Sequence, residues 1–334
     1  MAAENPVPGT GGDIYLPFEE RTGDTSVVFF TRDISPEGIK KAYRRVNEKI
    51  GGNVCIKLHT GEPNGPNFTP ASWIKEFMDT EAPDATIIET NTYYEGGRYS
   101  TGQHRQTLHV NGWDEFTTVD ITDAIDHHAK IPVKGGKWCD EISVGYGMLK
   151  YESMICITHF KGHSAGGFGG ANKNIGIGCA SGHEGKQWIH SENSGSQWGI
   201  GTEALMERIA ESTKGTIDFF DNRVAYVNLM RNMSVDCDCA GVSAAPVVTP
   251  NVGILASLDI CAIDTACVDI VWAMKEEDGA ALRERITSRH GLRQLTSMQV
   301  LGMGNMKYKL IDIDNDDAEI TPADCVVDLK PFQA

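Results

Sequence analysis

The stretch SMICITHFKGHSAGGFGGANKNIGIGCASGHEGKQWIH, residues 153–190, joins a short apolar run to a long glycine-rich segment. Four apolar residues stand immediately before Thr158 and His159, which is typical of a strand that is buried on both faces. The nine glycines between Gly162 and Gly185 are poor material for a helix or a strand. The stretch therefore predicts a buried strand that ends in a glycine-rich loop.

Similar apolar runs, rich in β-branched residues, recur along the chain, and each is followed by a polar or glycine-bearing loop. Segments with helical features lie between several of them. This alternation predicts an α/β fold with a mostly parallel sheet flanked by helices, and the glycine-rich ligand loop at the carboxyl ends of the strands. The expected strands are 26–30, 53–58, 85–89, 153–157, 224–229 and 252–256.

The expected helices carry features that mark their ends. One begins with Ser35 as N-cap and Pro36 at the first helical position, and it ends before Gly51. Asp259 is a candidate N-cap for a second helix, in which apolar residues recur at helical spacing. The remaining expected helices are 70–78 and 202–212, and the run after Asp259 extends to 274.

The chain has 334 residues, of which 40% are hydrophobic and 23% are charged, and its formal net charge is −16. We expect residues 1–15 to be a loose N-terminal segment and 16–334 to form an α/β domain. That domain is either a single unit or two closely packed lobes, with an approximate boundary near 160–200.

The net charge would repel nucleic acid and anionic lipid, and no apolar run is long enough to cross a bilayer. The N-terminal sequence lacks the basic end and apolar region of a secretion signal. We therefore expect a cytoplasmic protein whose partner is a small-molecule substrate, with no nucleic-acid or membrane partner. A homo-oligomer is compatible with the sequence.

Polar residues follow the expected strands, and the carboxyl ends of parallel strands meet at one rim of a sheet, where ligands bind in open α/β folds. These residues are Arg32 and Asp33, His59 and Glu62, Asn91 and Arg98, Thr158 and His159, and Arg231 and Asn232. The sequence thus predicts a ligand site at this rim.

Within the glycine-rich segment, glycines allow backbone N–H groups to approach an anion closely. The segment matches neither the P-loop pattern, since Lys173 follows Asn172, nor a dinucleotide-binding GxGxxG at a strand-to-helix turn. A flexible surface connector is the alternative interpretation. The candidate cofactor-binding residues are Gly166, Gly167, Gly169, Gly170, Lys173, Asn174 and Arg98.

Three residues are candidates for catalysis. His163 is suited to proton transfer, and Lys173 is suited to holding a substrate anion or, when desolvated, to nucleophilic attack. His104 follows an arginine-bearing segment in which Arg98 is placed to clamp a carboxylate or phosphate. The alternatives are a structurally hydrogen-bonded histidine, a solvated lysine and an exposed hairpin.

Cys237 and Cys239 form a C-x-C pair in a chain of nine cysteines. With His190 they are candidate metal ligands, although a closed zinc or iron–sulfur site normally needs four ligands. Metal, an iron–sulfur cluster and a nucleotide-type cofactor therefore all remain candidates. In a reducing compartment the cysteines would otherwise stay thiols.

The segment HFKGHSAGGFGGANKNIGIGCAS, together with DCDCAGVSAAPVVTPNVGILASLDICAIDTACVDIV at 236–271, closely resembles the family known as domain of unknown function 362. Weaker similarity near residues 55, 100 and 302 extends the resemblance over most of the chain. Many members of that family carry a ferredoxin-like insert with CxxCxxC runs. This sequence has no such insert, which removes the usual reason for expecting an iron–sulfur carrier.

The run GHSAGGFGGANK is also similar to a loop of the nickel-pincer lactate racemase family, in which a histidine precedes a lysine by ten residues. That resemblance implies cofactor attachment or anion binding for Lys173 and an acid–base role for His163. It further implies His190 or His183 as a metal ligand and His104 or His109 as a second acid–base group. Asn172 stands where that family has arginine, and we interpret the likeness as shared ancestry of the loop.

Three functions remain open. The first is an enzyme that acts on a small anionic substrate or with a phosphate-bearing cofactor, by redox or proton-transfer chemistry, hence of oxidoreductase or racemase and isomerase type. The second is a metal or iron–sulfur binding redox accessory protein. The third is a ligand-binding module without turnover. The residues do not select between redox chemistry and proton transfer, because both need an anion clamp and an acid–base group.

Overall fold

A computed structural model describes residues 15–124, 127–191 and 198–332. The N-terminal segment expected to be loose, 1–15, lies outside the described residues except for Tyr15. None of the helices within the described ranges has the length and apolar content that a membrane span needs.

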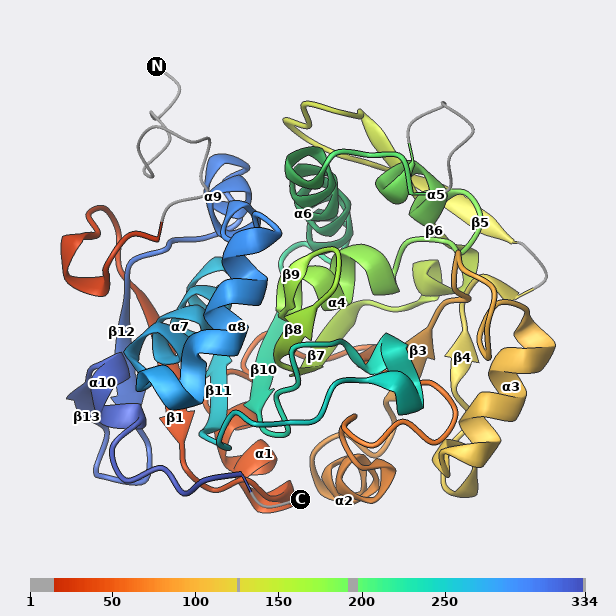
Figure 1. The fold of residues 1–334 in the computed structure, drawn as a ribbon. Helices are drawn as coiled ribbons and strands as arrows, with labels where there is room; N and C mark the ends of the chain where they lie inside the picture. The colour runs from red at the N-terminus through yellow and green to blue at the C-terminus, as the bar shows by residue number, and fades with distance from the viewer. Residues whose placement is uncertain (1–14, 125–126, 192–197, 333–334) are drawn as a thin grey trace.

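A nine-stranded, mostly parallel sheet forms the centre of the described chain (Figure 1), as the sequence predicted. Two strands run against the rest: β11 is antiparallel to both of its neighbours, and β13 is antiparallel to β12. In spatial order the strands are β13 (Ala318–Ile320), β12 (Tyr308–Asp312), β1 (Ser26–Thr31), β11 (Gly253–Ser257), β10 (Val224–Met230), β7 (Ser153–His159), β2 (Val54–Lys57), β3 (Thr86–Glu89) and β4 (Asp120–Ile121).

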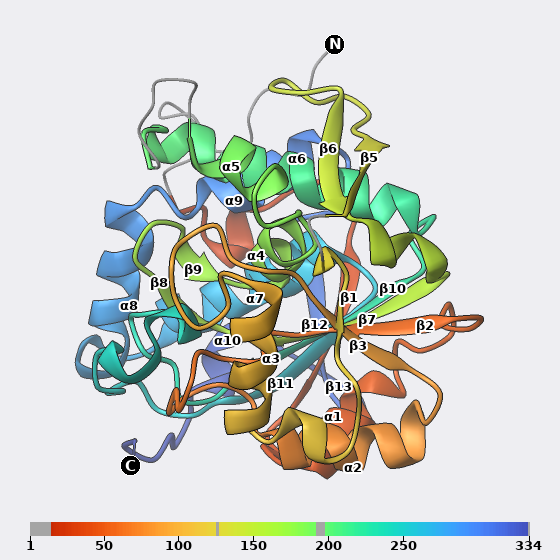
Figure 2. The same ribbon diagram turned by 90° about the vertical axis from the view of Figure 1, so that its right-hand side faces the viewer.

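Helices cover both faces of the sheet (Figure 2). Along β7, Met154 and Cys156 pack into one apolar core, whereas Ile155 and Ile157 pack into the other. The first core is completed by α4 (Ala171–Gly178), α6 (Thr202–Phe219), α7 (Ile260–Ala273), α8 (Glu276–Ser288) and α9 (Arg293–Val300). The second is completed by α1 (Pro36–Tyr43), α2 (Ala71–Glu81) and α3 (Thr101–Val110). The remaining helices are α5 (Gly185–His190) and α10 (Pro322–Cys325).

All six expected strands are present, and the two expected N-caps are confirmed. The Ser35 hydroxyl accepts a hydrogen bond from the N–H of Gly38, and the Asp259 carboxylate accepts one from the N–H of Ala262. The helix after Ser35 is shorter than expected, because it passes into tighter turns after Tyr43 instead of continuing to Gly51.

The glycine-rich segment is not the continuous loop that the sequence predicted. It forms an antiparallel hairpin of β8 (Lys161–His163) and β9 (Gly167–Gly169), followed by α4 and then α5. A second hairpin elsewhere pairs β5 (His128–Pro132) with β6 (Glu141–Gly145). The glycines of the first hairpin permit close backbone packing, since a Cβ on Gly162 would lie 2.2 Å from the carbonyl oxygen of Val235. Close tertiary packing here overrides the poor helix and strand propensity of glycine.

Candidate functional site

A pocket of about 380 Å³ lies at the carboxyl ends of β2, β3 and β7, between the glycine-rich segment and the chain that follows β10. Of the polar residues predicted at the ends of these three strands, His59 and Arg98 line the pocket, whereas Glu62, Asn91, Thr158 and His159 do not. Arg32 and Asp33, which follow β1, do not line this pocket, and neither do Arg231 and Asn232. The cationic side chains that line it are Lys57, Arg98, Lys161, Lys173 and Lys186.

Lys173 stands in the first turn of α4, and its side chain reaches the pocket. Among the residues that the structure describes, its ammonium has neither an ion-pair nor a hydrogen-bond partner. Lys161 differs, because its Nζ lies 3.0 Å from the carboxylate of Asp238. Lys173 therefore offers the pocket a positive charge that no carboxylate neutralises among the described residues, inside a protein whose net charge is negative.

Two buried carboxylates neutralise the cations at the floor of the pocket. The Nζ of Lys57 lies 2.8 Å from Glu89 Oε2, and Arg98 lies 2.9 Å from Glu62 and 3.6 Å from Glu89. Burial would raise the pKa of Glu89, but the charges of Lys57 and Arg98 outweigh it and hold this pKa well below its usual range. Glu89 is therefore a permanent anion that fixes Lys57 and Arg98.

Lys186, on α5, lacks a carboxylate at hydrogen-bonding distance. Its ammonium donates to the hydroxyl of Thr90 at 2.6 Å and to the carbonyl oxygen of Asn91. Burial lowers the pKa of Lys186 to about 8. Its charge is thus the most readily lost of the cations around the pocket.

His163 ends β8, and its ring is held in one tautomer by the backbone. Its Nδ1 accepts hydrogen bonds from the N–H of Ala165 at 3.1 Å and of Gly166 at 2.8 Å. In the neutral ring the proton is therefore on Nε2. Burial, followed by the charge of Lys173, lowers the pKa of His163 well below its usual value, so the ring is neutral near pH 7.

His190 ends α5 and takes the opposite tautomer. Its Nδ1 donates to the carbonyl oxygen of Lys186 at 2.8 Å, so the lone pair is on Nε2. The ring packs against Tyr93 and Trp198, with centroid distances of 6.3 Å and 5.1 Å. Burial lowers the pKa of His190 to about 4, and Lys173 contributes in the same direction. His163 thus presents a donor Nε2 to the pocket and His190 an acceptor Nε2. A third histidine, His59, also lines the pocket, and its Nδ1 accepts from the N–H of Gly61 at 2.9 Å.

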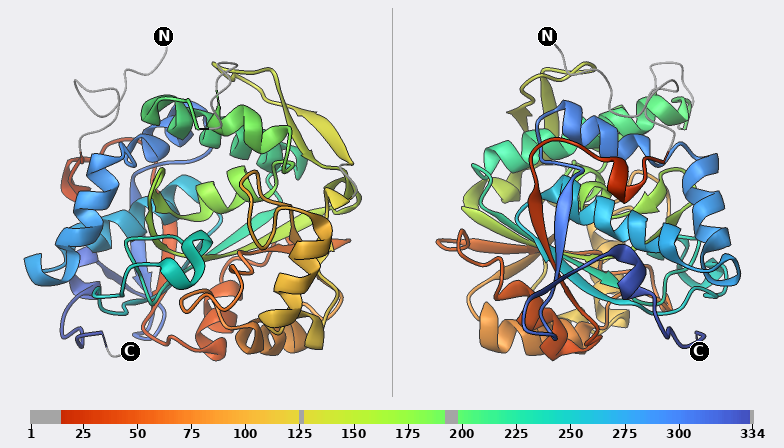
Figure 3. Two further views of the ribbon diagram at one scale, coloured as in Figure 1. Left: turned by 45° about the vertical axis from the view of Figure 1, so that its right-hand side comes forward. Right: turned by 90° about the vertical axis from the view of Figure 1, so that its left-hand side faces the viewer.

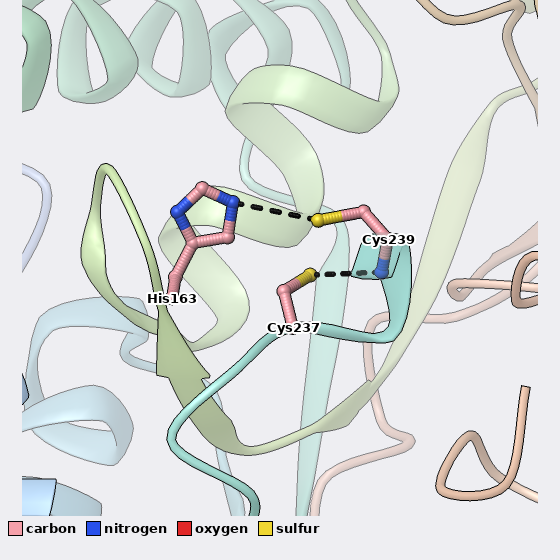
Figure 4. A group of neighbouring side chains, drawn as sticks. All are labelled: His163, Cys237 and Cys239. Atoms are coloured by element: carbon pink, nitrogen blue, oxygen red, sulfur yellow. Dashed lines mark hydrogen bonds between the residues drawn. The ribbon is translucent and has the colours of Figure 1, made fainter. Parts of the chain in front are cut away.

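Cys237 and Cys239 line the same pocket from the segment that follows β10, where the 3₁₀ helix η5 (Asp238–Ser243) begins. Figure 4 shows the Cys239 sulfur facing the ring of His163, and the distance from Sγ to Nε2 is 3.7 Å. The backbone N–H of Cys239 lies 3.5 Å from the Cys237 sulfur. The two thiols and the imidazole therefore form one cluster.

These three residues bring their ligand atoms within 4.8 Å of one another, which is close enough to surround a metal ion. The tautomer of His163 does not fit that use, because a protonated Nε2 has no lone pair for a metal. His190, the histidine expected from the sequence, is not in the group. An iron–sulfur cluster on four cysteines does not fit either, since only Cys237 and Cys239 line the pocket in the described chain.

His104, the third candidate for catalysis, lies outside the pocket lining. It is fully buried on α3, and its Nε2 has no hydrogen-bond partner among the described atoms. Burial lowers its pKa to about 3. Its expected role in proton transfer stays a prediction.

Of the candidate cofactor-binding residues, Gly169, Gly170 and Asn174 line the pocket together with Arg98 and Lys173, whereas Gly166 and Gly167 do not.

Several lining residues were not identified from the sequence. Lys57 and Glu89 end neighbouring parallel strands, and Tyr93, Lys186 and Trp198 come from three separate segments. A lysine and a glutamate at the ends of two otherwise apolar strands were visible in the sequence and are unusual there. Tyr93 and Trp198 had no comparable feature in the sequence around them that marked them as pocket residues.

Comparisons with known proteins give one family and two distant structures. The family model described as Domain of unknown function (DUF362) matches residues 54–269. The lactate racemase apoprotein from Thermoanaerobacterium thermosaccharolyticum is 13% identical, with a TM-score of 0.38 over 92% of this chain and 88% of that chain. A protein from Thermotoga maritima is 10% identical, with a TM-score of 0.37 over 58% and 50% of the two chains. No curated protein matches. At these TM-scores neither structure carries an argument about function.

Proposed function

Since the chain belongs to the DUF362 family, whose description assigns no activity, we propose a function from the pocket itself. The protein is an enzyme that binds a small anionic substrate, or the phosphate group of a cofactor, at Lys173. It moves a proton on that substrate with His163 and His190. The observation that carries this proposal is the ammonium of Lys173, which has no carboxylate partner among the described residues, beside two neutral histidines of opposite tautomer.

The two tautomers supply complementary proton-transfer groups. The Nε2 lone pair of His190 accepts a proton from the substrate, and the neutral Nε2–H of His163 donates a hydrogen bond to the carbonyl oxygen on which negative charge develops; His190 then returns the proton. A carboxylate held by Lys173 would place its neighbouring carbon within the same pocket, which suits removal and return of a proton beside a carbonyl group. The alternative occupant is a phosphate-bearing redox cofactor, because its phosphate would need the same ammonium of Lys173 as a binding partner.

Substrate binding would also tune the histidines. The positive charge of Lys173 lowers the pKa of both His163 and His190. A bound anion would neutralise that charge and raise both pKa values toward the usual value for histidine. The proton affinity of His190 would therefore rise when the substrate arrives, which brings this ring closer to the pKa that a general base near neutral pH requires.

Anion binding is tested by titrating inorganic phosphate and a series of small hydroxy and keto acids while following tryptophan fluorescence, to which Trp198 in the pocket wall contributes. We expect Lys173→Met to weaken the best ligand by about tenfold or more, as for loss of one hydrogen bond to a charged group. Lys75→Met, which removes an exposed cation on α2, is the control and should bind as the native protein does.

Proton transfer is tested by incubating the same acids in D₂O and following loss of the C–H signal by NMR. His163→Gln and His190→Gln should each abolish exchange while retaining most of the anion affinity. Absence of anion binding in the native protein, or exchange that persists in both glutamine variants, would refute the proposal.

A further inference from the structure

We propose that Cys237 and Cys239 form a redox-active dithiol that opens onto the same pocket and exchanges with small disulfides. This activity goes beyond the proton transfer proposed above and does not depend on it. The argument begins with position. Cys237 and Cys239 line the pocket wall, whereas no other cysteine of the described chain does.

The residue between the two cysteines fixes their direction. Asp238 is buried, and its carboxylate lies 3.0 Å from His159 Nδ1 and 3.0 Å from Lys161 Nζ. With Asp238 anchored in this way, the side chains on either side of it reach the pocket (Figure 4). The two sulfurs lie within 4.8 Å of each other, and side-chain rotation must close the remaining distance to an S–S bond of about 2 Å.

The electrostatic surroundings single out one of the two sulfurs. A hydrogen bond from the Cys239 thiol lowers the pKa of Cys237 well below its usual value, and Lys173 and Lys161 add to the effect. The pKa of Cys239 is raised by the same pairing, so Cys237 is the sulfur that ionises first. In contrast, the pKa of every other cysteine is raised. A thiolate is the reactive form of cysteine in disulfide exchange.

Two steps complete the exchange with a small disulfide RSSR. The Cys237 thiolate attacks one sulfur, the S–S bond of RSSR breaks, and the departing RS⁻ takes the proton from the Cys239 thiol. The new Cys239 thiolate then attacks the Cys237 sulfur of the mixed disulfide and expels the second RS⁻. Two electrons pass from the protein to RSSR, which is reduced while the Cys237–Cys239 disulfide forms.

His163 assists the second step, in which the Cys239 thiolate attacks the mixed disulfide. Its Nε2–H points toward the Cys239 sulfur at 3.7 Å and would stabilise the thiolate formed there. The ammonium of Lys173, which no carboxylate neutralises among the described residues, favours a negatively charged disulfide over a neutral one. The substrate class is therefore a small disulfide that carries carboxylate groups.

The test uses the full native chain, reduced and then mixed with dithiodiglycolic acid or with the neutral hydroxyethyl disulfide. After alkylation, mass spectrometry of the peptide that holds both cysteines should show the loss of two hydrogens and no alkyl group. The anionic disulfide should react several-fold faster than the neutral one. Cys139, which is partly exposed but whose pKa burial raises to about 12, should remain free and alkylatable.

Variants separate the two steps. Cys239→Ser should stop at a mixed disulfide on Cys237, Cys237→Ser should lose the fast reaction, and Cys139→Ser should behave as the native protein does. Alkylation of both pocket cysteines after the disulfide treatment would overturn the proposal. Elemental analysis showing a stoichiometric metal that blocks both thiols until it is chelated would overturn it as well. A failure of phosphate binding at Lys173 would remove the expected preference for the anionic disulfide but not the formation of the Cys237–Cys239 disulfide, so the two proposals fail separately.

Discussion

The carboxylate of Asp264, inside α7, accepts a hydrogen bond from the backbone N–H of Ala171, the first residue of α4, at 2.7 Å. Its other oxygen accepts from the N–H of Asn172 at 2.9 Å, and the side chain of Asn228 donates to the first oxygen, Oδ1, at 2.8 Å. A residue 93 positions away in the sequence therefore caps the helix that carries Lys173. The position of the free ammonium depends on a buried carboxylate of the core.

Replacing this carboxylate should destabilise the protein and weaken the site together. Asp264→Ala leaves two buried amides without acceptors, and we expect a loss of about 2 to 4 kcal/mol in the free energy of unfolding. Phosphate binding should weaken in parallel. Asp264→Asn is the matched control, since one oxygen remains to accept, and it should lose less. Urea unfolding measures the stability of both variants, and phosphate titration measures their binding. An alanine variant as stable as the native protein would contradict this role for Asp264.

The pair of Lys57 and Glu89 should be costly to break. Both side chains are buried, so Glu89→Gln leaves the ammonium of Lys57 without its counter-ion, and we expect a loss of about 3 to 5 kcal/mol. The exposed pair of Lys75 and Asp79 provides the control, because Asp79→Asn should change the stability by less than about 0.5 kcal/mol. Equal effects of the two substitutions in chemical unfolding would show that the buried pair is not a structural element.

Gly178, the last residue of α4, should not tolerate a side chain. A Cβ there would lie 2.2 Å from Cε and 2.6 Å from Nζ of Lys57, whose ammonium is already fixed by Glu89. We expect Gly178→Ala to destabilise by about 1 to 3 kcal/mol through overpacking. Gly102→Ala, on the open surface of α3, should instead stabilise by about 0.5 to 1 kcal/mol. Thermal unfolding of the two variants should therefore shift in opposite directions.

The buried histidines should make the protein sensitive to mild acid. The usual pKa of histidine is 6.5, and that of His190 in the folded state is about 4, so between these values the unfolded chain binds a proton that the folded chain does not. Stability therefore falls as the pH drops through this range, by about 3 kcal/mol from His190 alone. Burial of His104, whose pKa is about 3, extends the loss to lower pH.

Urea unfolding at several pH values between 7 and 4 checks this prediction. His190→Phe should flatten the dependence, while substitution of the exposed His109 by Gln should leave it unchanged. An unaltered slope in His190→Phe would mean that this ring is not the source of the acid sensitivity.

The apolar strands and the caps at Ser35 and Asp259 were predictable because each depends on residues that are close in the sequence. The rim site was predictable in outline for the same reason, since polar residues directly follow buried strands. The secondary structure of the glycine-rich segment was not, because contacts such as those of Gly162 with Val235 and of Asp264 with Ala171 join residues that are far apart in the sequence.

Which site residues lie next to each other could not be predicted from the sequence either. The proximity of His163 to Cys239 depends on how the hairpin of β8 and β9 lies against the chain after β10. The sequence favoured His190 beside the C-x-C pair, and the structure brings His163 there instead. Helix α3 was not among the expected helices, and Gly102 in its first turn weakens the local helix signal.

The place of β1 in the sheet has a consequence for the order in which the chain folds. Its neighbours are β11 and β12, which lie more than two hundred residues further along the chain (Figure 3). On the ribosome, the strands from β2 to β10 emerge and can pair while β1 still has no neighbour to join. The apolar side chains of Val28 and Phe30 therefore stay exposed until β11 and β12 have emerged, which makes this strand a segment of the nascent chain where a chaperone would bind.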